Sequence, residues 1–357
     1  MGFKCGIVGL PNVGKSTLFN ALTSSKNAQA ANFPFCTIDP NIGIVDVPDN
    51  RLNSLSTISK SDKKINANIT FVDIAGLVKG ASKGEGLGNK FLSHIREVDA
   101  IIHLVRCFDS ENIQHVNKNI DPVNDLETIK TEILLADINQ IEKKLQKNLK
   151  KKLTEKQIEL LKNILVRLNN GDTLDTNYDL ESKKFLKETG LISNKPYIIV
   201  CNVDEQSVKN GNNYTKLLKE KYSDQKFVSI CADIESQIID LKPEERENYM
   251  KNIGLEKTGL DKLITTGYDL LNLNTFFTSG PKETRAWTVK KNTEAQRAAG
   301  VIHSDFEKNF IRAEVVSYDD FQKYGGFEKA KENGKLRVEG KNYFVKDGDV
   351  LIFRVNP

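Results

Sequence analysis

Long apolar runs and paired cysteines are the features that this sequence lacks. No stretch reaches the roughly 18 consecutive apolar residues of a membrane-spanning helix, so we expect no membrane partner. The cysteines are few and dispersed, and no two of them form a C-x-x-C pair. Such a set argues against a zinc site or a disulfide framework and favours a reducing compartment. The chain runs almost at once into an apolar segment, which leaves no room for a signal peptide. We therefore expect a cytoplasmic protein.

A strong charge of either sign is also missing. The 52 Lys and Arg residues exceed the 48 Asp and Glu residues only slightly, and so small an excess does not by itself indicate nucleic-acid binding. Hydrophobic residues make up 39% and charged residues 28% of the 357 residues. These values are typical of a soluble globular chain, and the length suits two or three domains.

The most informative stretch is residues 9–17, which match the phosphate-loop pattern G-x-x-x-x-G-K-[ST]. An apolar, strand-like run precedes it and a helix-like segment follows, as this motif requires. Backbone N–H groups of such a loop and the N-terminus of the helix bind phosphate. We expect Lys15 to contact the β- and γ-phosphates and the Ser16 hydroxyl to bind Mg²⁺. The nucleotide-binding residues predicted here are Asn12, Val13, Gly14, Lys15, Ser16 and Thr17.

A second phosphate motif, D-x-x-G, occupies residues 73–76 after another strand-like run. We expect Asp73 to act on Mg²⁺ through water and the Gly76 amide to sense the γ-phosphate. Several glycines follow, and they favour a mobile switch segment. Thr37 lies between the two motifs, so we predict it as the second hydroxyl ligand of Mg²⁺, the alternative being an ordinary loop threonine. The predicted metal site is thus Ser16, Thr37 and Asp73.

Residue 77 is Leu, where familiar GTPases have the Gln that orients the attacking water. An aliphatic side chain cannot orient water, so another residue must do so. His103 lies inside an apolar strand and is expected in the core. His115 follows that strand in a polar loop, from which it could reach a γ-phosphate. We predict Lys15 and His115 as the catalytic residues.

The segment that usually recognises guanine, N-K-x-D, reads N-V-D-E at residues 202–205. The Asp carboxylate that accepts from guanine N1–H and N2–H₂ is replaced by the longer Glu205, which is misplaced for that contact. Asn202 can pair with purine N7 and an exocyclic amine, which adenine offers. The remaining base-binding residues predicted here are Val203, Ser229 and Cys231. This pattern favours ATP and leaves GTP open.

The chain pattern changes twice. Residues 1–120 and 190–275 alternate strand-like and helix-like runs, which predicts an α/β domain with a parallel sheet. Residues 121–189 carry two apolar stripes at helical spacing, which predict an inserted antiparallel helical hairpin. Lysines crowd its tip at residues 143–156, and a solvated helix end is the plain alternative.

Residues 276–357 read as short strands, with 15 basic and 12 acidic residues. An Asp-Gly turn at residues 346–349 predicts a hairpin between strands 341–345 and 350–355. Basic residues near Trp287 and Phe310 suit RNA backbone and base stacking, although a solvated domain surface would look similar. The basic residues in question are Lys282, Arg285, Lys290, Lys291, Arg297, Lys308 and Arg312.

Six strings, spread over nearly the whole chain, carry a family resemblance: residues 9–17, 32–37, 73–88, 106–108, 272–277 and 285–288. They resemble the YchF / Obg-like ATPase family of P-loop proteins. The resemblance implies a Ras-like P-loop NTPase domain with an inserted α-helical hairpin and a C-terminal β-grasp (TGS) domain. It implies Mg²⁺, slow hydrolysis with ATP preferred over GTP, and association with ribosomes, especially the large subunit. The family's proposed catalytic histidine matches His115, and Asn12 matches an asparagine that helps hold K⁺ in some relatives. Asp204 departs from the usual pattern of the base-recognition segment.

We therefore expect a monomeric, nucleotide-switched ATPase that contacts ribosomal RNA or protein through the TGS domain and the helical hairpin. The alternatives are a GTPase of ribosome assembly and a nucleotide-sensing, RNA-binding adaptor with negligible turnover. Leu77 motivates the adaptor, and the comparison of ATP with GTP affinity separates the two enzymes.

Overall fold

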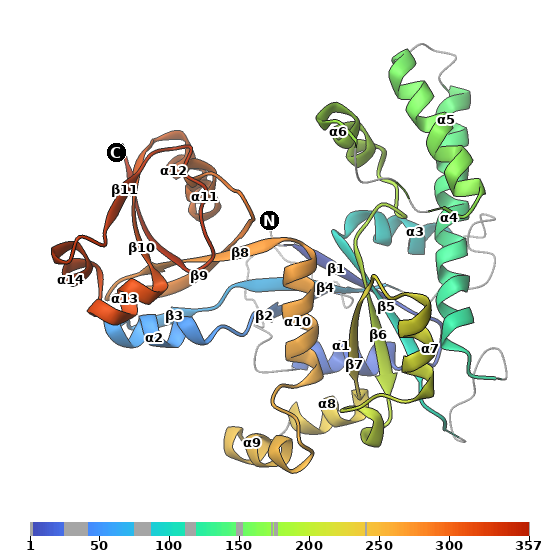
Figure 1. Ribbon diagram of the computed structural model, residues 1–357, viewed down its shortest axis with the longest axis horizontal. Coiled ribbons are helices and arrows are strands. Elements are labelled where there is room, and N and C mark those ends of the chain that lie inside the picture. Colours follow the sequence, from blue (N-terminus) through green and yellow to red (C-terminus); the bar gives the residue numbers. More distant parts are fainter. Residues whose placement is uncertain are drawn as a thin grey trace.

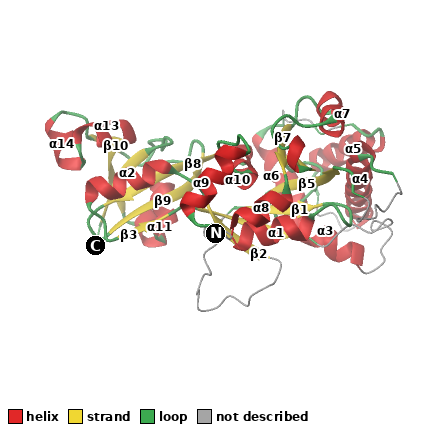
Figure 2. Ribbon diagram, turned by 90° about the horizontal axis from the view of Figure 1, so that it is seen from below, coloured by secondary structure: helices red, strands yellow, loops and turns green. Residues whose placement is uncertain are grey.

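The computed structural model describes residues 3–24, 42–74, 87–110, 119–147, 153–172, 174, 178–239 and 241–356. The described residues form two six-stranded sheets in two lobes that lie side by side (Figures 1 and 2). The first sheet has the strand order β2-β4-β1-β5-β6-β7. Its strands are β1 (Lys4–Val8), β2 (Ile42–Asp46), β4 (Asn68–Asp73), β5 (Ala100–Cys107), β6 (Tyr197–Val203) and β7 (Lys226–Ile230).

The expectation of a wholly parallel first sheet is wrong at one edge. Strands β4, β1, β5, β6 and β7 pair in parallel, whereas β2 pairs antiparallel with β4, with Ile42 opposite Val72 and Asp46 opposite Asn68. A parallel pair requires a connection that crosses over the sheet. The chain after β2 instead leaves this sheet for the other lobe and comes back as β4, directly beside β2 and in the opposite direction. An antiparallel edge strand is the result.

Helices cover both faces of this sheet because its central strands are apolar on both sides. On β6, Ile199 and Cys201 pack with α7, and Ile198 and Val200 pack with α10. The covering helices are α1 (Lys15–Ser24), α3 (Leu87–Glu97), the start of α4 (Pro122–Lys147), α7 (Asn213–Lys221) and α10 (Gly259–Leu270). Helix α8 (Ala232–Ile239) packs against α1. The short helix η3 (Glu205–Ser207) follows β6, and α9 (Pro243–Asn252) precedes α10.

The predicted helical hairpin is present (Figure 1). Helix α4 leaves the sheet and packs against α5 (Glu155–Asn169) and then α6 (Leu180–Thr189). A separate apolar cluster joins the three helices, with Ile141, Leu161 and Phe185 among its members. The Thr154 hydroxyl accepts from the backbone N–H of Gln157 and closes a capping box that starts α5. None of the described helices is both long and apolar enough to cross a bilayer.

The second sheet has the strand order β11-β10-β12-β8-β9-β3. Its strands are β8 (Leu273–Ser279), β9 (Glu283–Lys290), β10 (Phe310–Ser317), β11 (Arg337–Glu339), β12 (Asp349–Val355) and, from much earlier in the chain, β3 (Lys63–Ile65). Helices α11 (Ala295–Ile302) and α12 (Ser304–Lys308) lie on one face. The other face carries α2 (Asn50–Ser59), α13 (Tyr318–Tyr324) and α14 (Phe327–Glu332) (Figure 2).

One excursion of the chain therefore builds part of the distant lobe. Between β2 and β4, helix α2 packs on the second sheet and β3 pairs in parallel with β9. The Ser61 hydroxyl donates to the carbonyl oxygen of Gly280 at 2.7 Å, and the backbone N–H of Asp62 donates to the carbonyl oxygen of Pro281 at 2.8 Å. The two lobes are thus joined by sheet pairing as well as by the chain that runs from α10 into β8.

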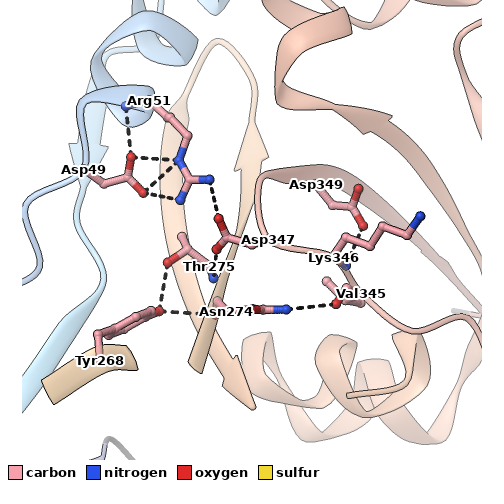
Figure 3. A network of polar contacts seen from close by, with 9 residues as sticks. All are labelled: Asp49, Arg51, Tyr268, Asn274, Thr275, Val345, Lys346, Asp347 and Asp349. Carbon is pink, nitrogen blue, oxygen red and sulfur yellow. Dashed lines mark hydrogen bonds and ion pairs between the residues drawn. The ribbon is translucent and has the colours of Figure 1, made fainter. Parts of the chain in front are cut away.

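The predicted hairpin between residues 341–345 and 350–355 is wrong. Residues 341–345 form no ladder with β12; their β-pairing among the described residues is an isolated bridge from Phe344 to Glu294. Strand β12 pairs antiparallel with β10 and parallel with β8. The turn bonds to β8 instead, as Figure 3 shows: the Thr275 N–H donates to the Asp347 carboxylate at 2.8 Å. The Gly348 N–H donates to the Thr275 carbonyl oxygen, also at 2.8 Å. These two bonds direct the turn across the sheet.

Candidate functional site

The phosphate loop lies between β1 and α1, and its backbone conformation favours glycine or asparagine at particular positions. Asn12 and Gly14 have φ angles of 65° and 92°, in the left-handed region. A Cβ atom at Gly9 would lie 2.8 Å from the carbonyl oxygen of Leu104 on β5. A Cβ atom at Gly14 would clash with the side-chain amide of Asn202. Both motif glycines are therefore required by close approach, and Gly14 also by its φ angle.

The structure brings the two predicted phosphate motifs together. Lys15 begins α1, Asp73 ends β4, and the Lys15 ammonium forms an ion pair and hydrogen bond with the Asp73 carboxylate. Their side chains are 13% and 17% exposed, so both charges are largely withdrawn from water. A phosphate group that binds Lys15 would compete with Asp73 for the ammonium, and a cation would compete for the carboxylate.

The residues present fit a magnesium-bound nucleotide. Ser16 and Thr17 are exposed in the first turn of α1, where backbone N–H groups have no partner within the helix. With Asp73 they offer hydroxyl and carboxylate oxygens, the donors that Mg²⁺ prefers. Among the described residues no cluster of three or more His, Cys, Asp or Glu could hold a metal ion. A metal here would depend on few protein ligands and on phosphate oxygens, as is usual for Mg²⁺ in nucleotide sites.

Asn202 does more than sequence reasoning assigned to it. Its side chain is 4% exposed; Nδ2 donates to the carbonyl oxygen of Val13 at 3.0 Å, and Oδ1 accepts from the backbone N–H of Ala232 at 3.1 Å. One amide therefore ties the phosphate loop to the segment after β7. The sequence offered a signal for this link, because Asn202 lies near the end of one strand and Ala232 follows the next.

The other predicted base-binding residues lie at the carboxyl ends of β6 and β7. Val203 is buried, and Cys231 is buried directly after β7, where burial raises the pKa of its thiol. Ser229 lies opposite Cys201 in the β6–β7 pairing and is partly exposed. Adjacent parallel strands end at one edge, so these residues are brought to the Asn202 side of the phosphate loop.

The two carboxylates of the base-recognition segment have different environments. Asp204 caps η3: its carboxylate accepts from the Ser207 N–H at 2.9 Å and from the Ser207 hydroxyl at 3.0 Å. Glu205 is exposed. Asp204, the residue that departs from the family pattern, thus uses its carboxylate to cap η3, whereas the Glu205 carboxylate faces solvent.

Four residues discussed from the sequence, Thr37, Gly76, Leu77 and His115, lie outside the described residues, so their predicted roles stay predictions. His103 is confirmed as a core histidine: it is 2% exposed, and its ring meets that of Tyr197 edge-on at 5.2 Å. Burial lowers the pKa of His103 to about 3, so it is neutral at physiological pH.

Sequence reasoning did not assign a role to Arg106, which is one of the largest fully buried side chains. Its Nε donates to the carbonyl oxygen of Phe108 at 3.1 Å and its Nη2 to that of Ser110 at 3.3 Å. Its guanidinium also lies 4.8 Å from the centroid of the Phe108 ring. Arg106 therefore fixes the chain as it leaves β5, just before the segment that contains His115.

Comparison with known proteins places this site in a family. A family model described as "50S ribosome-binding GTPase" matches residues 4–136, and the YchF-GTPase_C model, described as "Protein of unknown function (DUF933)", matches residues 273–356. Curated proteins named ribosome-binding ATPase YchF, from Haemophilus influenzae and Bacillus subtilis, are 49% and 48% identical, with 100% of each chain covered.

The solved structure of the Schizosaccharomyces pombe YchF GTPase is 35% identical, with a TM-score of 0.89 over 99% of this chain and 98% of that one. The expected α/β fold, a P-loop domain followed by a distinct C-terminal domain, is confirmed by these matches. On the full-length identity to these relatives, the chain belongs to the YchF family.

Proposed function

We propose that this chain is a ribosome-associated P-loop ATPase that hydrolyses ATP slowly and acts as a nucleotide-dependent switch. The observation that carries the proposal is the convergence of Lys15 and Asp73 at a correctly built phosphate loop. Its relatives in Haemophilus influenzae and Escherichia coli O157:H7, aligned over their full length, are named ribosome-binding ATPases. The cytoplasm, where ribosomes are, is the proposed location.

Residues of the phosphate loop would hold the nucleotide. Backbone N–H groups from Asn12 to Thr17 surround the phosphates, Lys15 pairs with the β- and γ-phosphates, and Ser16 contributes a metal ligand. Mg²⁺, when bound, neutralises charge on the phosphate oxygens. We keep Thr37 and Asp73 as the other metal-site residues, Gly76 as the γ-phosphate contact, and Asn12 as the residue near K⁺.

The base-recognition segment supports ATP over GTP. The Asp204 carboxylate already accepts two hydrogen bonds from Ser207 at the cap of η3. The Glu205 side chain is one methylene longer than the aspartate that guanine recognition uses. Asn202 holds the site together through Val13 and Ala232, and its amide keeps a second N–H and a second lone pair for the base. We therefore keep Asn202, Val203, Ser229 and Cys231 as the proposed base neighbours. GTP binding is the alternative, and the Schizosaccharomyces pombe relative is named a GTPase.

Calorimetric titration tests the nucleotide preference. The protein is titrated with non-hydrolysable ATP and GTP analogues in Mg²⁺, with K⁺ or Na⁺ as the monovalent salt. Tighter binding of the ATP analogue supports the ATPase, and tighter binding of the GTP analogue favours the GTPase of ribosome assembly. A requirement for K⁺ supports the role given to Asn12.

The C-terminal lobe carries the proposed RNA contact. The Arg285 guanidinium lies 4.0 Å from the centroid of the Trp287 ring, which stacks on Phe276 at 6.4 Å. Basic and aromatic groups in this arrangement suit phosphate contact and base stacking. We propose contact with the large ribosomal subunit through this lobe and the lysine-rich hairpin tip. We also propose a monomer divided at the expected boundaries: residues 1–120 and 190–275, 121–189, and 276–357.

Hydrolysis assays with and without 50S subunits separate the enzyme from the adaptor. Measurable ATP turnover that ribosomes stimulate supports the switch enzyme. Turnover at background level, with ribosome binding retained, supports the adaptor that Leu77 motivates. Charge reversal at Lys290, Lys291 and Arg297 is expected to reduce co-sedimentation with 50S subunits, and unchanged co-sedimentation would mean that these residues form a solvated surface.

A further inference from the structure

A groove follows the outer edge of β7, on the side of the first sheet away from β6. Within the described residues no strand pairs with this edge, because β7 is the last strand of the sheet. The groove has a volume of about 310 Å³. Its lining residues are Val208, Lys209, Asn210, Gly211, Lys219, Phe227, Val228, Ser229, Lys262 and Thr266.

The groove exists because helices cover the two faces of the sheet and leave the edge open. On one face, Phe227 packs beside Leu218 of α7. On the other, Val228 packs with Leu263 and Ile264 of α10. In Figure 1 β7 lies between the two helices. Lys219 projects from the first helix and Lys262 from the second, so the edge strand lies between two lysines.

All charged side chains that line the groove are positive. Lys209, Lys219 and Lys262 are exposed, and the lining residues include no Asp or Glu. Other lysines of these helices are paired: Lys216 with Glu220 at 3.9 Å, and Lys221 with Glu127. The three groove lysines form no ion pair with any described residue. Their charges thus remain available to a partner.

Lys209 has a defined place at one end of this groove. Its ammonium lies close to Gly254, where an added Cβ atom would approach it to 2.9 Å. Gly254 has a φ of 70° and turns the chain between α9 and α10. The lysine thus spans from the loop after η3 to the turn before α10.

We propose that the β7 edge groove binds an extended, acidic polypeptide segment of a partner, which adds to the sheet as a further strand. An open edge strand presents a row of backbone N–H and C=O groups that a polypeptide matches bond for bond. Carboxylates on the added strand would meet Lys219 and Lys262 on either side. RNA phosphates could pair with the lysines but could not hydrogen-bond the strand backbone as an added strand does. The open edge therefore favours a peptide over RNA as the ligand. This surface shares Ser229 with the proposed base neighbours and is otherwise separate from the nucleotide and RNA contacts proposed above.

The probe is a fluorescein-labelled, acetylated heptapeptide, Asp-Val-Glu-Val-Asp-Val-Glu, followed by fluorescence anisotropy with the full-length protein. We expect saturable binding that weakens at least tenfold in K209E/K219E/K262E. The matched control K329E/K331E/K335E changes three exposed lysines on and after α14 and is expected to bind as the unchanged protein does.

The double variant K219Q/K262Q replaces the triple variant in the binding measurement if the triple variant fails to fold. ATP hydrolysis by each variant shows that the nucleotide site is intact, so failure here is distinguishable from failure of the proposed ATPase.

Hydrogen exchange decides whether the peptide forms a strand. Slower exchange of the β7 amides at residues 226–230 on peptide binding supports strand addition. The proposal is overturned by binding that leaves those amides unprotected, by equal loss in the control variant, or by no binding at all. It is also overturned if a heptanucleotide RNA displaces the peptide at a lower concentration than the unlabelled peptide does.

Discussion

The guanidinium of Arg51 lies 2.6 Å from the carboxylate of Asp347, although 296 residues separate them in the chain. Figure 3 shows the network around this pair. Arg51 also bonds the Asp49 carboxylate at 2.7 Å, and the other Asp347 oxygen accepts from the Thr275 N–H. A helix inserted between two strands of the nucleotide-binding sheet is thus bound to the turn before the last strand of the other sheet. The strands that flank this insertion, β2 and β4, follow and precede the two predicted switch segments.

Replacing Arg51 tests how much this link stabilises the pair of lobes. We expect Arg51→Met to lower the free energy of unfolding by about 1–2 kcal/mol, because charge-assisted bonds to two carboxylates are lost. Urea unfolding measures the change. Lys329→Met, at an exposed site, is the control and is expected to change it by less than about 0.5 kcal/mol. Equal effects of the two substitutions would contradict a specific role for the pair.

Gly14→Ala is expected to weaken nucleotide binding at least tenfold. The new Cβ would meet the Asn202 amide, and the backbone would be held at a φ of 92°. Gly171→Ala is a matched control, since Gly171 has a φ of 76° but nothing within 4 Å of an added Cβ. The control should cost about 1 kcal/mol of stability and leave nucleotide affinity unchanged. Parallel calorimetric titrations and thermal melts check both expectations.

Asp204 and Glu205 are expected to give different phenotypes. Asp204→Ala removes the cap of η3 and should lower stability by about 1 kcal/mol without changing the ratio of ATP to GTP affinity. Glu205→Ala should leave both stability and that ratio nearly unchanged, because the side chain is exposed and its carboxylate is misplaced for the contact with guanine. If Asp204→Ala alone changes the ratio, Asp204 reads the base and the proposed assignment is wrong.

Arg106 is expected to act on hydrolysis through the chain that it holds. Arg106→Lys keeps the charge but cannot bond both carbonyl oxygens in the same geometry, so the turnover number should fall about tenfold with little change in ATP affinity. His115→Ala should lower turnover by a similar or larger factor. If Arg106 positions the His115 segment, the double variant should be no slower than His115→Ala. Multiplicative losses would show that the two residues act independently.

Glu235 predicts a pH dependence of stability. Burial raises the pKa of this carboxyl from 4.5 to about 7, although it accepts from the Gly259 N–H at 2.6 Å at the start of α10. The folded protein therefore holds a proton that the unfolded chain releases near pH 4.5. Its contribution to stability is full below pH 4.5 and is lost as the pH rises toward 7. Glu235→Gln should flatten the dependence of unfolding free energy on pH in that window, and an unchanged slope would contradict the raised pKa.

Local spacing was enough to predict much of the first lobe. The strand–loop–helix around Lys15, the D-x-x-G after β4, the helical hairpin and most strands of the first sheet follow from patterns a few residues long. Such patterns report which side chains face a core and where the backbone must turn. The core position of His103 was predictable for the same reason, since it lies in a continuous apolar run.

Pairing between distant segments was decided only by the tertiary structure. The strand Lys63–Ile65 has no periodic signal, yet it completes a sheet that starts more than 200 residues later. Asp347 and Gly348 carry the local signature of a hairpin but bond across the sheet to Thr275. Asn202 was predicted to touch the base, and its two protein partners come from separate segments. In each case backbone and buried polar groups take the partners that packing brings within reach, and sequence spacing does not encode that proximity.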